Sequence, residues 1–212
     1  MSHDRSCSTC ISSCYSRKLA RAVYNYYETM KQYSSLYYNT RVKRIQTLLD
    51  QGELAEAEGL LVELCTQHKT DVELWLQLGE LRIRQHKLIA ARAAFNQVLA
   101  IEPDNAQALR GQAQSLLALG DIKTAEPLIQ TLLTQQPDSP SAQLLRVESL
   151  RRQFRYGEAL NLARSLREQP IIPASVKRQL AIEEGMCYLG RADYSAALAQ
   201  FEIALQRQPN DI

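Results

Sequence analysis

Alanine recurs along most of this chain at a nearly constant interval. Successive members of the series are 34, 34, 34 and 38 residues apart, at Ala57, Ala91, Ala125, Ala159 and Ala197. A fixed period in this range is typical of stacked copies of one small structural unit, because no single copy can bury its apolar face alone. The interval therefore predicts a repeat architecture with units 38–71, 72–105, 106–139, 140–173 and 178–211.

Two further apolar columns keep the same register. Three residues before each alanine stand Leu54, Leu88, Ile122, Tyr156 and Tyr194. Four residues after each alanine stand Leu61, Phe95, Ile129, Ala163 and Phe201. Side chains with these spacings share one face of an α-helix, so the second half of each unit is predicted to be helical.

Each unit is predicted to contain two antiparallel helices. Residues 71–105 show two helix-period apolar patterns joined by a short polar turn. The repeated alanine lets the second helix approach the first closely, and Gly79 and Gly185 do the same from the first helix. Ser139 is expected to cap the helix that starts at Pro140. Proline ends the second helices, since it lacks an N–H group and clashes with the preceding turn, at Pro103, Pro137, Pro170 and Pro209.

The unit at 72–105 carries residues that resemble the tetratricopeptide repeat, a helix–turn–helix unit of 34 residues: Trp75, Leu78, Gly79, Ala91, Phe95 and Pro103. The resemblance covers residues 38–211. It implies an all-α fold, a right-handed α-solenoid of about five helix pairs with an N-terminal extra helix. It also implies that the chain binds other proteins, because such repeats do so far more often than they catalyse reactions.

Three places depart from the pattern. Arg41 and Arg44 occupy positions where the first helix of the first unit should be apolar, which weakens the prediction of its pairing. Pro127 falls inside the second helix of the third unit, where it removes one backbone hydrogen bond and favours a kink. The segment 170–175 adds four residues between the last two units, and it is expected to change the angle between the two halves of the array.

Residues 1–15 are rich in Ser and Cys and have no helical period, so they are expected to form a disordered leader. Three cysteines leave open the alternative of a thiolate metal site, with His3 as the local candidate for a fourth ligand, at Cys7, Cys10 and Cys14. A start at Met30 is a further alternative, because it would keep the whole array. We predict no bound metal and no cofactor.

Residues 16–37 are predicted to form an amphipathic, Tyr-rich helix. Its apolar stripe advances in steps of four and three, through Leu19, Val23, Tyr26, Met30, Tyr33 and Tyr37. Residues 1–44 hold eight Lys or Arg and two Asp or Glu. We expect this helix to cap the exposed end of the array, and contact with a partner, RNA or a membrane surface is the alternative.

Composition argues against several classes of function. The net charge of +2 is too small to indicate nucleic-acid binding, and no apolar run reaches the roughly 18 residues of a membrane span. The N-terminus lacks the apolar segment of a secretory signal. Five cysteines without a disulfide framework favour a reducing compartment, in which Cys65 and Cys187 would be buried thiols. These features predict a cytoplasmic location.

The sequence contains no recognisable catalytic constellation. It has neither a Gly-rich phosphate loop nor an H-E-x-x-H motif. His68 and His86 stand at opposite ends of one predicted helix, about 20 Å apart, so they cannot share one ligand, and each is expected to be a solvated loop residue. The chain is therefore predicted not to be an enzyme.

In tetratricopeptide-repeat proteins, the first helices of successive units line a concave groove that holds a peptide or a partner helix. The resemblance predicts apolar patches at Leu76, Leu144 and Ile182, and a solvated face without a ligand is the alternative. The polar groove positions implied by the resemblance are Lys43, Gln46, Glu73, Gln77, Glu80, Arg84, Gln107, Arg110, Gln114, Glu148, Arg151, Gln179 and Glu183.

Members of the family that bind chaperone tails clamp a terminal carboxylate with Lys, Asn and Arg. The matching positions in this chain are Val42, Gln46, Gln107 and Gly111. None of these side chains carries a positive charge, so that ligand is not expected.

We therefore predict a non-catalytic scaffold that binds a peptide or partner helix in the concave groove. The alternative is the N-terminal recruiting or regulatory segment of a larger enzyme, such as a sulfotransferase or glycosyltransferase. No polar closing helix follows Leu205 before Ile212. Leu198 and Leu205 would leave an open apolar edge on the last helix, which predicts self-association or a covering segment.

Overall fold

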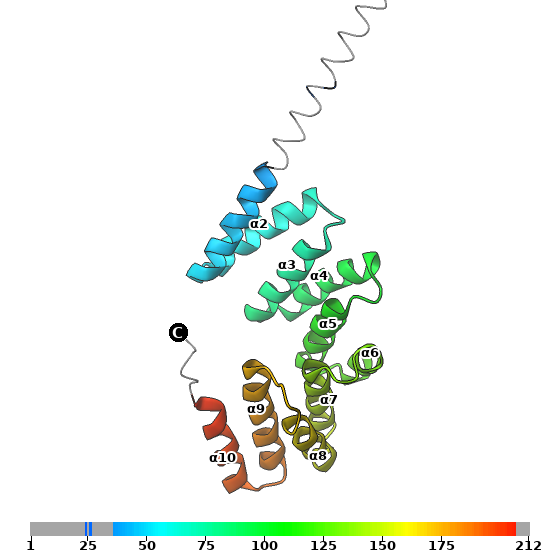
Figure 1. Ribbon diagram of the computed structural model, residues 1–212, viewed down its shortest axis with the longest axis vertical. Helices are drawn as coiled ribbons and strands as arrows, with labels where there is room; N and C mark the ends of the chain where they lie inside the picture. Colours follow the sequence, from blue (N-terminus) through cyan, green and yellow to red (C-terminus); the bar gives the residue numbers. More distant parts are fainter. Residues whose placement is uncertain (1–23, 25, 27–35, 207–212) are drawn as a thin grey trace, which may run out of the picture. The chain divides into compact units, whose positions relative to one another are not determined.

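The computed structural model describes residues 24, 26 and 36–206, which consist of helices and turns without a strand (Figure 1). The chain divides into two compact units, residues 1–64 and 65–212. The predicted leader at 1–15, with its three cysteines, lies outside the described residues, and so does most of the predicted helix at 16–37.

The helices follow the predicted pairing of two per repeat. The first described helix covers residues 36–51. The later helices are α2 (Leu54–Gln67), α3 (Val72–Arg84), α4 (Leu88–Ile101), α5 (Ala106–Ala118), α6 (Ile122–Gln135), α7 (Pro140–Arg152), α8 (Tyr156–Arg167), α9 (Ala174–Gly190) and α10 (Tyr194–Leu205). The predicted all-α fold is confirmed.

In the first unit, the helix at 36–51 is paired with α2. Two arginines that weakened this prediction form ion pairs with carboxylates of α2: Arg41 with Glu63 at 3.5 Å, and Arg44 with Glu56 at 3.3 Å. The arginines are part-exposed or exposed, so they do not interrupt the core. The buried apolar side chains of the pair are Ile45, Leu48, Ala57, Leu61 and Leu64.

The helix at 36–51 has no break between Tyr37 and Tyr38, where the spacing predicted the end of one helix and the start of the first unit. No Gly or Pro stands at that point to interrupt a helix. The first glycine after it, Gly52, follows the helix with a φ of 79°. The first helix of this pair therefore already includes residue 36, and the helix end expected at Tyr37 is absent.

In the second unit, helices α3 to α10 stack in chain order (Figure 1). Each helix contacts the next, and the first helices α3, α5, α7 and α9 also contact one another in succession. The second helices α4, α6, α8 and α10 make no such contacts with one another in this described part. The first helices therefore form a continuous inner layer, and the second helices spread apart around it.

The alanine column is buried, with no exposed surface at Ala91, Ala125 and Ala159 and 1% at Ala197. Phe95 on α4 fills the space beside Gly79 of α3, where an added Cβ would lie 2.6 Å from the ring carbon Cε1. The same ring fills the space beside Gly111 of α5. Phe95 therefore connects one helix pair to the next.

Two helices of the second unit, α3 and α5, begin at a side-chain cap, and a third, α7, lacks the cap that the sequence predicted. Asp71 and Asn105 accept hydrogen bonds from backbone N–H groups three residues on, at 3.3 and 3.0 Å. Ser139 is the N-cap residue of α7, as expected, but its side chain makes no capping hydrogen bond. The expected side-chain cap at Ser139 is therefore wrong, and the fixed φ of Pro140 in the first turn favours the helix start without it.

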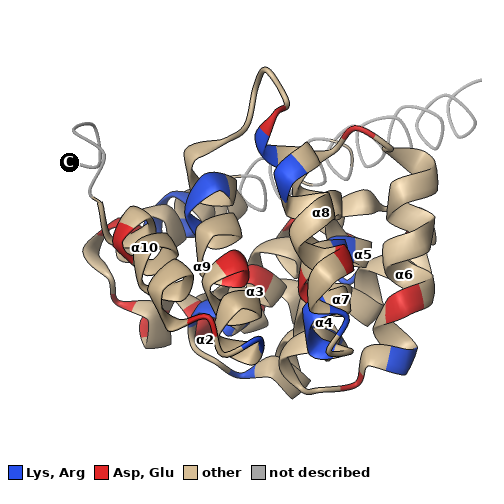
Figure 2. Ribbon diagram, turned by 90° about the horizontal axis from the view of Figure 1, so that it is seen from below, with Lys and Arg blue, Asp and Glu red and all other residues tan. Residues whose placement is uncertain are grey.

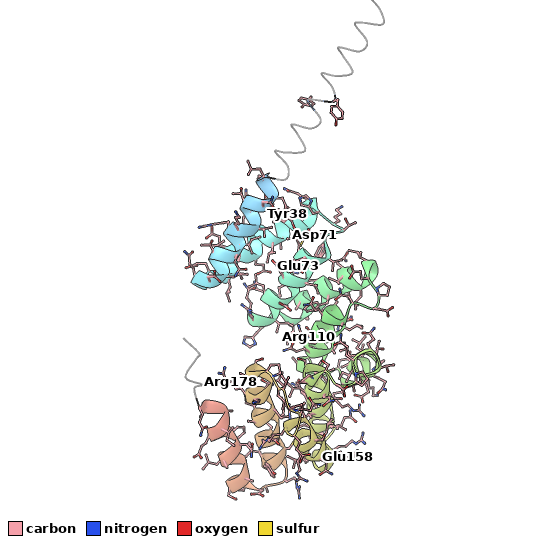
Figure 3. The ribbon with its side chains drawn as sticks, in the orientation of Figure 1. Tyr38, Asp71, Glu73, Arg110, Glu158 and Arg178 are labelled. Atoms are coloured by element: carbon pink, nitrogen blue, oxygen red, sulfur yellow. The ribbon has the colours of Figure 1, made fainter. Side chains whose placement is uncertain are left out.

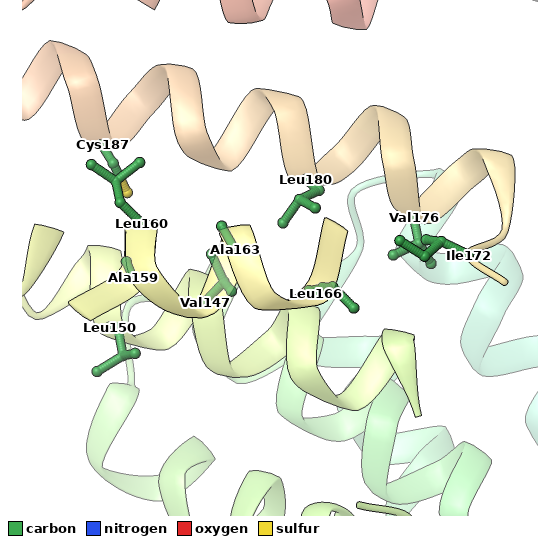
Figure 4. Close-up of a cluster of buried hydrophobic side chains, with 10 residues drawn as sticks. All are labelled: Val147, Leu150, Ala159, Leu160, Ala163, Leu166, Ile172, Val176, Leu180 and Cys187. Atoms are coloured by element: carbon green, nitrogen blue, oxygen red, sulfur yellow. The ribbon is translucent and has the colours of Figure 1, made fainter. Parts of the chain in front are cut away.

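The irregular segments of the second unit do not interrupt its helices. Helix α6 continues across Pro127. The insert at 170–175 contributes to the core, because Ile172 is buried in one cluster with Leu166, Val176 and Leu180 (Figure 4). The change of angle expected from the insert stays a prediction.

Candidate functional site

A groove runs across the inner layer of the second unit. It has a volume of about 370 Å³ and is lined by three successive first helices, α5, α7 and α9. A smaller hollow of about 240 Å³ shares Arg110 and Ser141 with it. We call the larger space the inner groove, and its lining residues are Arg110, Gln114, Ala118, Ser141, Leu144, Leu145, Glu148, Ser175, Val176 and Gln179.

The structure brings four of the predicted polar groove residues together. Arg110, Gln114, Glu148 and Gln179 all line the inner groove. Gln107 lines the smaller hollow beside Arg110. The stacking of first helices therefore gathers side chains from three repeat units on one surface.

Six other predicted residues lie on earlier helices. Lys43 and Gln46 belong to the first unit, on the helix at 36–51. Figure 3 labels Glu73 on α3 and Arg110 on α5, two first helices in contact. The predicted residues on α3 are Glu73, Gln77, Glu80 and Arg84.

The last two predicted polar residues are engaged with each other. Nε of Arg151 donates a hydrogen bond to Oε2 of Glu183 at 2.5 Å. Arg151 lines a different pocket, and Glu183 is only 3% exposed. Leu76, expected as an apolar patch of the groove, is buried in the core around Phe95. Helical spacing alone assigned these residues to the groove face. Part of that face is instead covered, because a first helix contacts both the second helix of its own pair and the next first helix.

The acidic side chains near the groove are paired with arginines. Nε of Arg152 donates to Glu148 at 2.8 Å. Burial raises the pKa of the Glu148 carboxyl above its ordinary value, and the nearby charge of Glu183 adds to this while Arg152 opposes it. Arg110 pairs with Glu80 of α3 at 3.4 Å. Both charge signs occur along the helices of this unit (Figure 2).

The amide side chains have unused hydrogen-bonding capacity. Gln107 and Gln114 are exposed, and neither side chain has a hydrogen-bond partner among the described residues. Gln179 donates to Glu183 at 3.1 Å through Nε2, which leaves its Oε1 as an acceptor. An amide both donates and accepts hydrogen bonds, as a peptide group does. These side chains can therefore form further hydrogen bonds.

Sequence reasoning missed several lining residues. Ser141 and Leu145 precede Glu148 by seven and three positions, so they share its helix face. Ser175 and Val176 precede Gln179 by four and three. The helical period was the signal that could have identified them, once a single residue of each first helix was assigned to the groove.

The two thiols of the described helices are buried, as predicted, at Cys65 and Cys187. Burial raises the pKa of Cys65 to about 12 and that of Cys187 to about 11, so both stay protonated near neutral pH. In the part of the chain that the structure describes, no cluster of three or more His, Cys, Asp or Glu is suited to a metal ion. No described helix combines the length and apolar character needed to cross a membrane.

Comparison with known proteins identifies the repeat. Residues 82–148 match the family model described as tetratricopeptide repeat. A structure of MamA from Desulfovibrio magneticus RS-1 is 18% identical and has a TM-score of 0.60, with 79% of this chain and 92% of that chain covered. A tetratricopeptide repeat protein from Parabacteroides merdae ATCC 43184 is also 18% identical, with a TM-score of 0.69 and coverage of 80% of this chain and 65% of that chain.

A third similar structure is YrrB, described as a tetratricopeptide-repeat protein with an unusual peptide-binding site. It is 17% identical, has a TM-score of 0.54, and the match covers 81% of this chain and 86% of that chain. No curated protein matches the chain. At these identities the similar structures establish the fold, an all-α solenoid of paired helices.

Proposed function

Because the chain is a tetratricopeptide-repeat protein, with the family match at residues 82–148, we propose that it is a non-catalytic interaction scaffold. In this proposal, the inner groove binds an extended peptide or a helix of a partner protein. We further propose a cytoplasmic location, in agreement with the cysteine content.

The observation that carries the proposal is the set of amides in the inner groove. Gln114 on α5 and Gln179 on α9 lie on either side of α7. The Gln114 amide and the Oε1 atom of Gln179 can each form a hydrogen bond with a ligand. Leu144 of α7 supplies an apolar surface between them. A few placed polar groups in a partly apolar concave surface are typical of ligand sites. The peptide-binding site described for YrrB supports the proposal by analogy of fold.

The test is selection of peptides from a random displayed library against the full chain, followed by affinity measurement on a double variant. Gln114→Ala with Gln179→Ala is expected to weaken the selected peptide about tenfold, because two hydrogen bonds worth roughly 0.5–1.5 kcal/mol each are lost. Unfolding curves should show unchanged stability, because both residues are exposed.

The matched control replaces two exposed amides on second helices, Gln97 of α4 and Gln130 of α6, by alanine. This control should retain the affinity of the wild-type chain. Equal affinities for wild type and the groove variant, or equal losses in groove and control variants, would place the binding site elsewhere.

An exposed apolar face on α10 supports a second proposal, that the chain self-associates through its last helix. Tyr194, Leu198 and Leu205 expose 70%, 60% and 81% of their surface. Among the twelve residues of α10, Glu202 is the only charged one. Such an apolar strip on a protein surface commonly marks an interface, and a second copy of the chain would present the same strip.

Light scattering on the full chain tests this second proposal. Wild type is expected to form dimers at high concentration, and Leu198→Lys with Leu205→Lys should give a monomer with unchanged helicity. Ile89→Lys is the control, because Ile89 is 72% exposed on α4, outside the strip. A monomeric wild-type chain would reject self-association.

A further inference from the structure

A second pocket lies where the turns after α5 and α7 meet the end of α9. It has a volume of about 430 Å³, and none of its lining residues lines the inner groove. We call it the turn pocket. Its lining includes Arg151, Arg152, Phe154, Tyr156, Met186 and Leu189.

Phe154 occupies a backbone position that favours glycine. Its φ is 62°, in a region where bulky side chains are rare. The turn itself imposes this conformation, because the equivalent turn positions also have positive φ, at Gly52, His86, Gly120 and Ala192. Glycine adopts it without the clash that a Cβ causes. Phenylalanine at this point therefore strains the backbone.

The Phe154 side chain gains little burial in return. It is 78% exposed, and its ring makes an edge-to-face contact with Tyr156 at a centroid distance of 6.2 Å. Tyr156 in turn lies against Gly190, where no Cβ would fit. Met186 and Leu189, each 41% exposed, extend the apolar surface of the pocket. Strained backbone under an exposed aromatic ring is a combination found at functional sites.

The pocket also contains unused cationic donors. Arg151 and Arg152 each contact a carboxylate through Nε, and their terminal nitrogens have no acceptor among the described residues. The bound carboxylates hold both guanidinium groups in place, so the remaining N–H groups can receive an anion without ordering a long side chain. Next to the lining residues, the exposed Lys123 and Arg191 have no ion pair within residues 36–206.

We propose that the turn pocket binds an acidic segment of a partner protein in which an aromatic or large aliphatic side chain stands beside a carboxylate. The apolar side chain would pack on the Phe154 ring and the surface of Leu189. The carboxylate would accept hydrogen bonds from the terminal nitrogens of Arg151 and Arg152. None of the residues lining this site lines the inner groove, although Arg152 is hydrogen-bonded to Glu148 of that groove.

The probes are three fluorescein-labelled peptides that separate the two parts of the proposal: Asp-Glu-Phe-Glu-Asp, its uncharged form Asn-Gln-Phe-Gln-Asn, and its form without the ring, Asp-Glu-Ala-Glu-Asp. Fluorescence anisotropy with the full chain measures the affinities. The acidic peptide with Phe is expected to bind at least about fivefold more tightly than either of the others. The uncharged peptide lacks the charge-assisted contact, and the peptide without the ring lacks the central aromatic contact.

Phe154→Gly separates binding from stability. It relieves the strained φ, so the melting temperature should stay the same or rise, while affinity for the acidic Phe peptide should fall at least about fivefold. His86→Gly makes the same backbone change in the turn between α3 and α4, outside the pocket, and should leave affinity unchanged. Gln114→Ala, in the inner groove and without a hydrogen bond to Arg151 or Arg152, should also leave it unchanged.

The three-peptide comparison does not depend on any variant folding. No binding, or equal affinity for all three peptides, would overturn the proposal. So would full affinity in Phe154→Gly. Loss of affinity in the groove variant would assign these peptides to the inner groove and reject the turn pocket as their site.

Discussion

The helix pairs α3–α4 and α7–α8 bury the same two repeat positions, but the large and the small side chain are exchanged between the two helices. In α3–α4, Gly79 faces Phe95, and a Cβ on the glycine would lie 2.6 Å from the ring. In α7–α8, the residues 68 positions later are Val147 and Ala163. Both are fully buried and belong to one core cluster. The larger side chain therefore belongs to the second helix in one pair and to the first helix in the other.

The remaining pairs of the second unit follow the same rule. Ala113 of α5 and Ile129 of α6 are fully buried in one cluster. Gly185 of α9 lies against Phe201 of α10, where a Cβ would be 2.5 Å from the ring. A smaller residue on one helix is thus matched by a larger one on its partner. The repeat keeps the summed volume of two positions, rather than the residue at either one, because close packing depends on total volume.

The largest expected effect comes from removing the Phe95 ring. Phe95→Ala should lower the free energy of unfolding by about 3–5 kcal/mol, because the ring fills space at both Gly79 and Gly111. Val147→Ala, in the pair with the opposite arrangement, should cost about 2 kcal/mol, because it removes two methyl groups. Urea unfolding followed by circular dichroism measures both. Equal losses of unfolding free energy in the two variants would contradict the difference in packing between the two pairs.

Overpacking the alanine column should have the next largest effect. Ala91→Leu and Ala125→Leu are each expected to cost about 1–3 kcal/mol, because a larger side chain has no space at these buried positions. Ala100→Leu is the control, since Ala100 is exposed on α4. An unchanged melting temperature in both column variants would contradict the register of the repeat.

A double-mutant cycle tests the volume rule itself. Gly79→Val alone should destabilise by about 1–3 kcal/mol, because its side chain meets the Phe95 ring. In the Phe95→Ala background the same change should cost less, with a coupling energy of at least about 0.5 kcal/mol. Strictly additive effects would mean that the two positions do not share one space.

The smallest expected effect concerns the turns. His86→Gly should raise stability by about 0.5–1 kcal/mol, because it removes a Cβ from a left-handed position. Phe154→Gly should raise it by less, because that variant also loses the ring contact with Tyr156. Differential scanning calorimetry measures the stability of both variants and so compares the turn of the α3–α4 pair with that of the α7–α8 pair. A loss of stability in His86→Gly would contradict the assigned strain.

Features that repeat in the chain could be predicted from the sequence. The alanine spacing predicted the helix pairs and the buried column. The left-handed turn column was missed, since only Gly52 and Gly120 carry the glycine that signals it.

Features that depend on contacts between units could not be predicted from spacing. Glu183 stands on the predicted groove face of its helix, yet its pairing with Arg151 of α7 leaves it buried. Arg110, Gln114 and Gln179 line one groove because α5, α7 and α9 stack in contact. Which side chains remain open to a ligand is decided by those ion pairs, and no single repeat contains both partners.

Amide hydrogen exchange of the full chain, with and without a peptide selected by display, tests the binding face most directly. If the inner groove holds the peptide, its addition should slow exchange in α5, α7 and α9 and leave α4, α6 and α8 unchanged, since ligand contacts stabilise the helices that make them. Slower exchange confined to the second helices, or to the turns around Phe154, would contradict the assignment of the inner groove as the binding site.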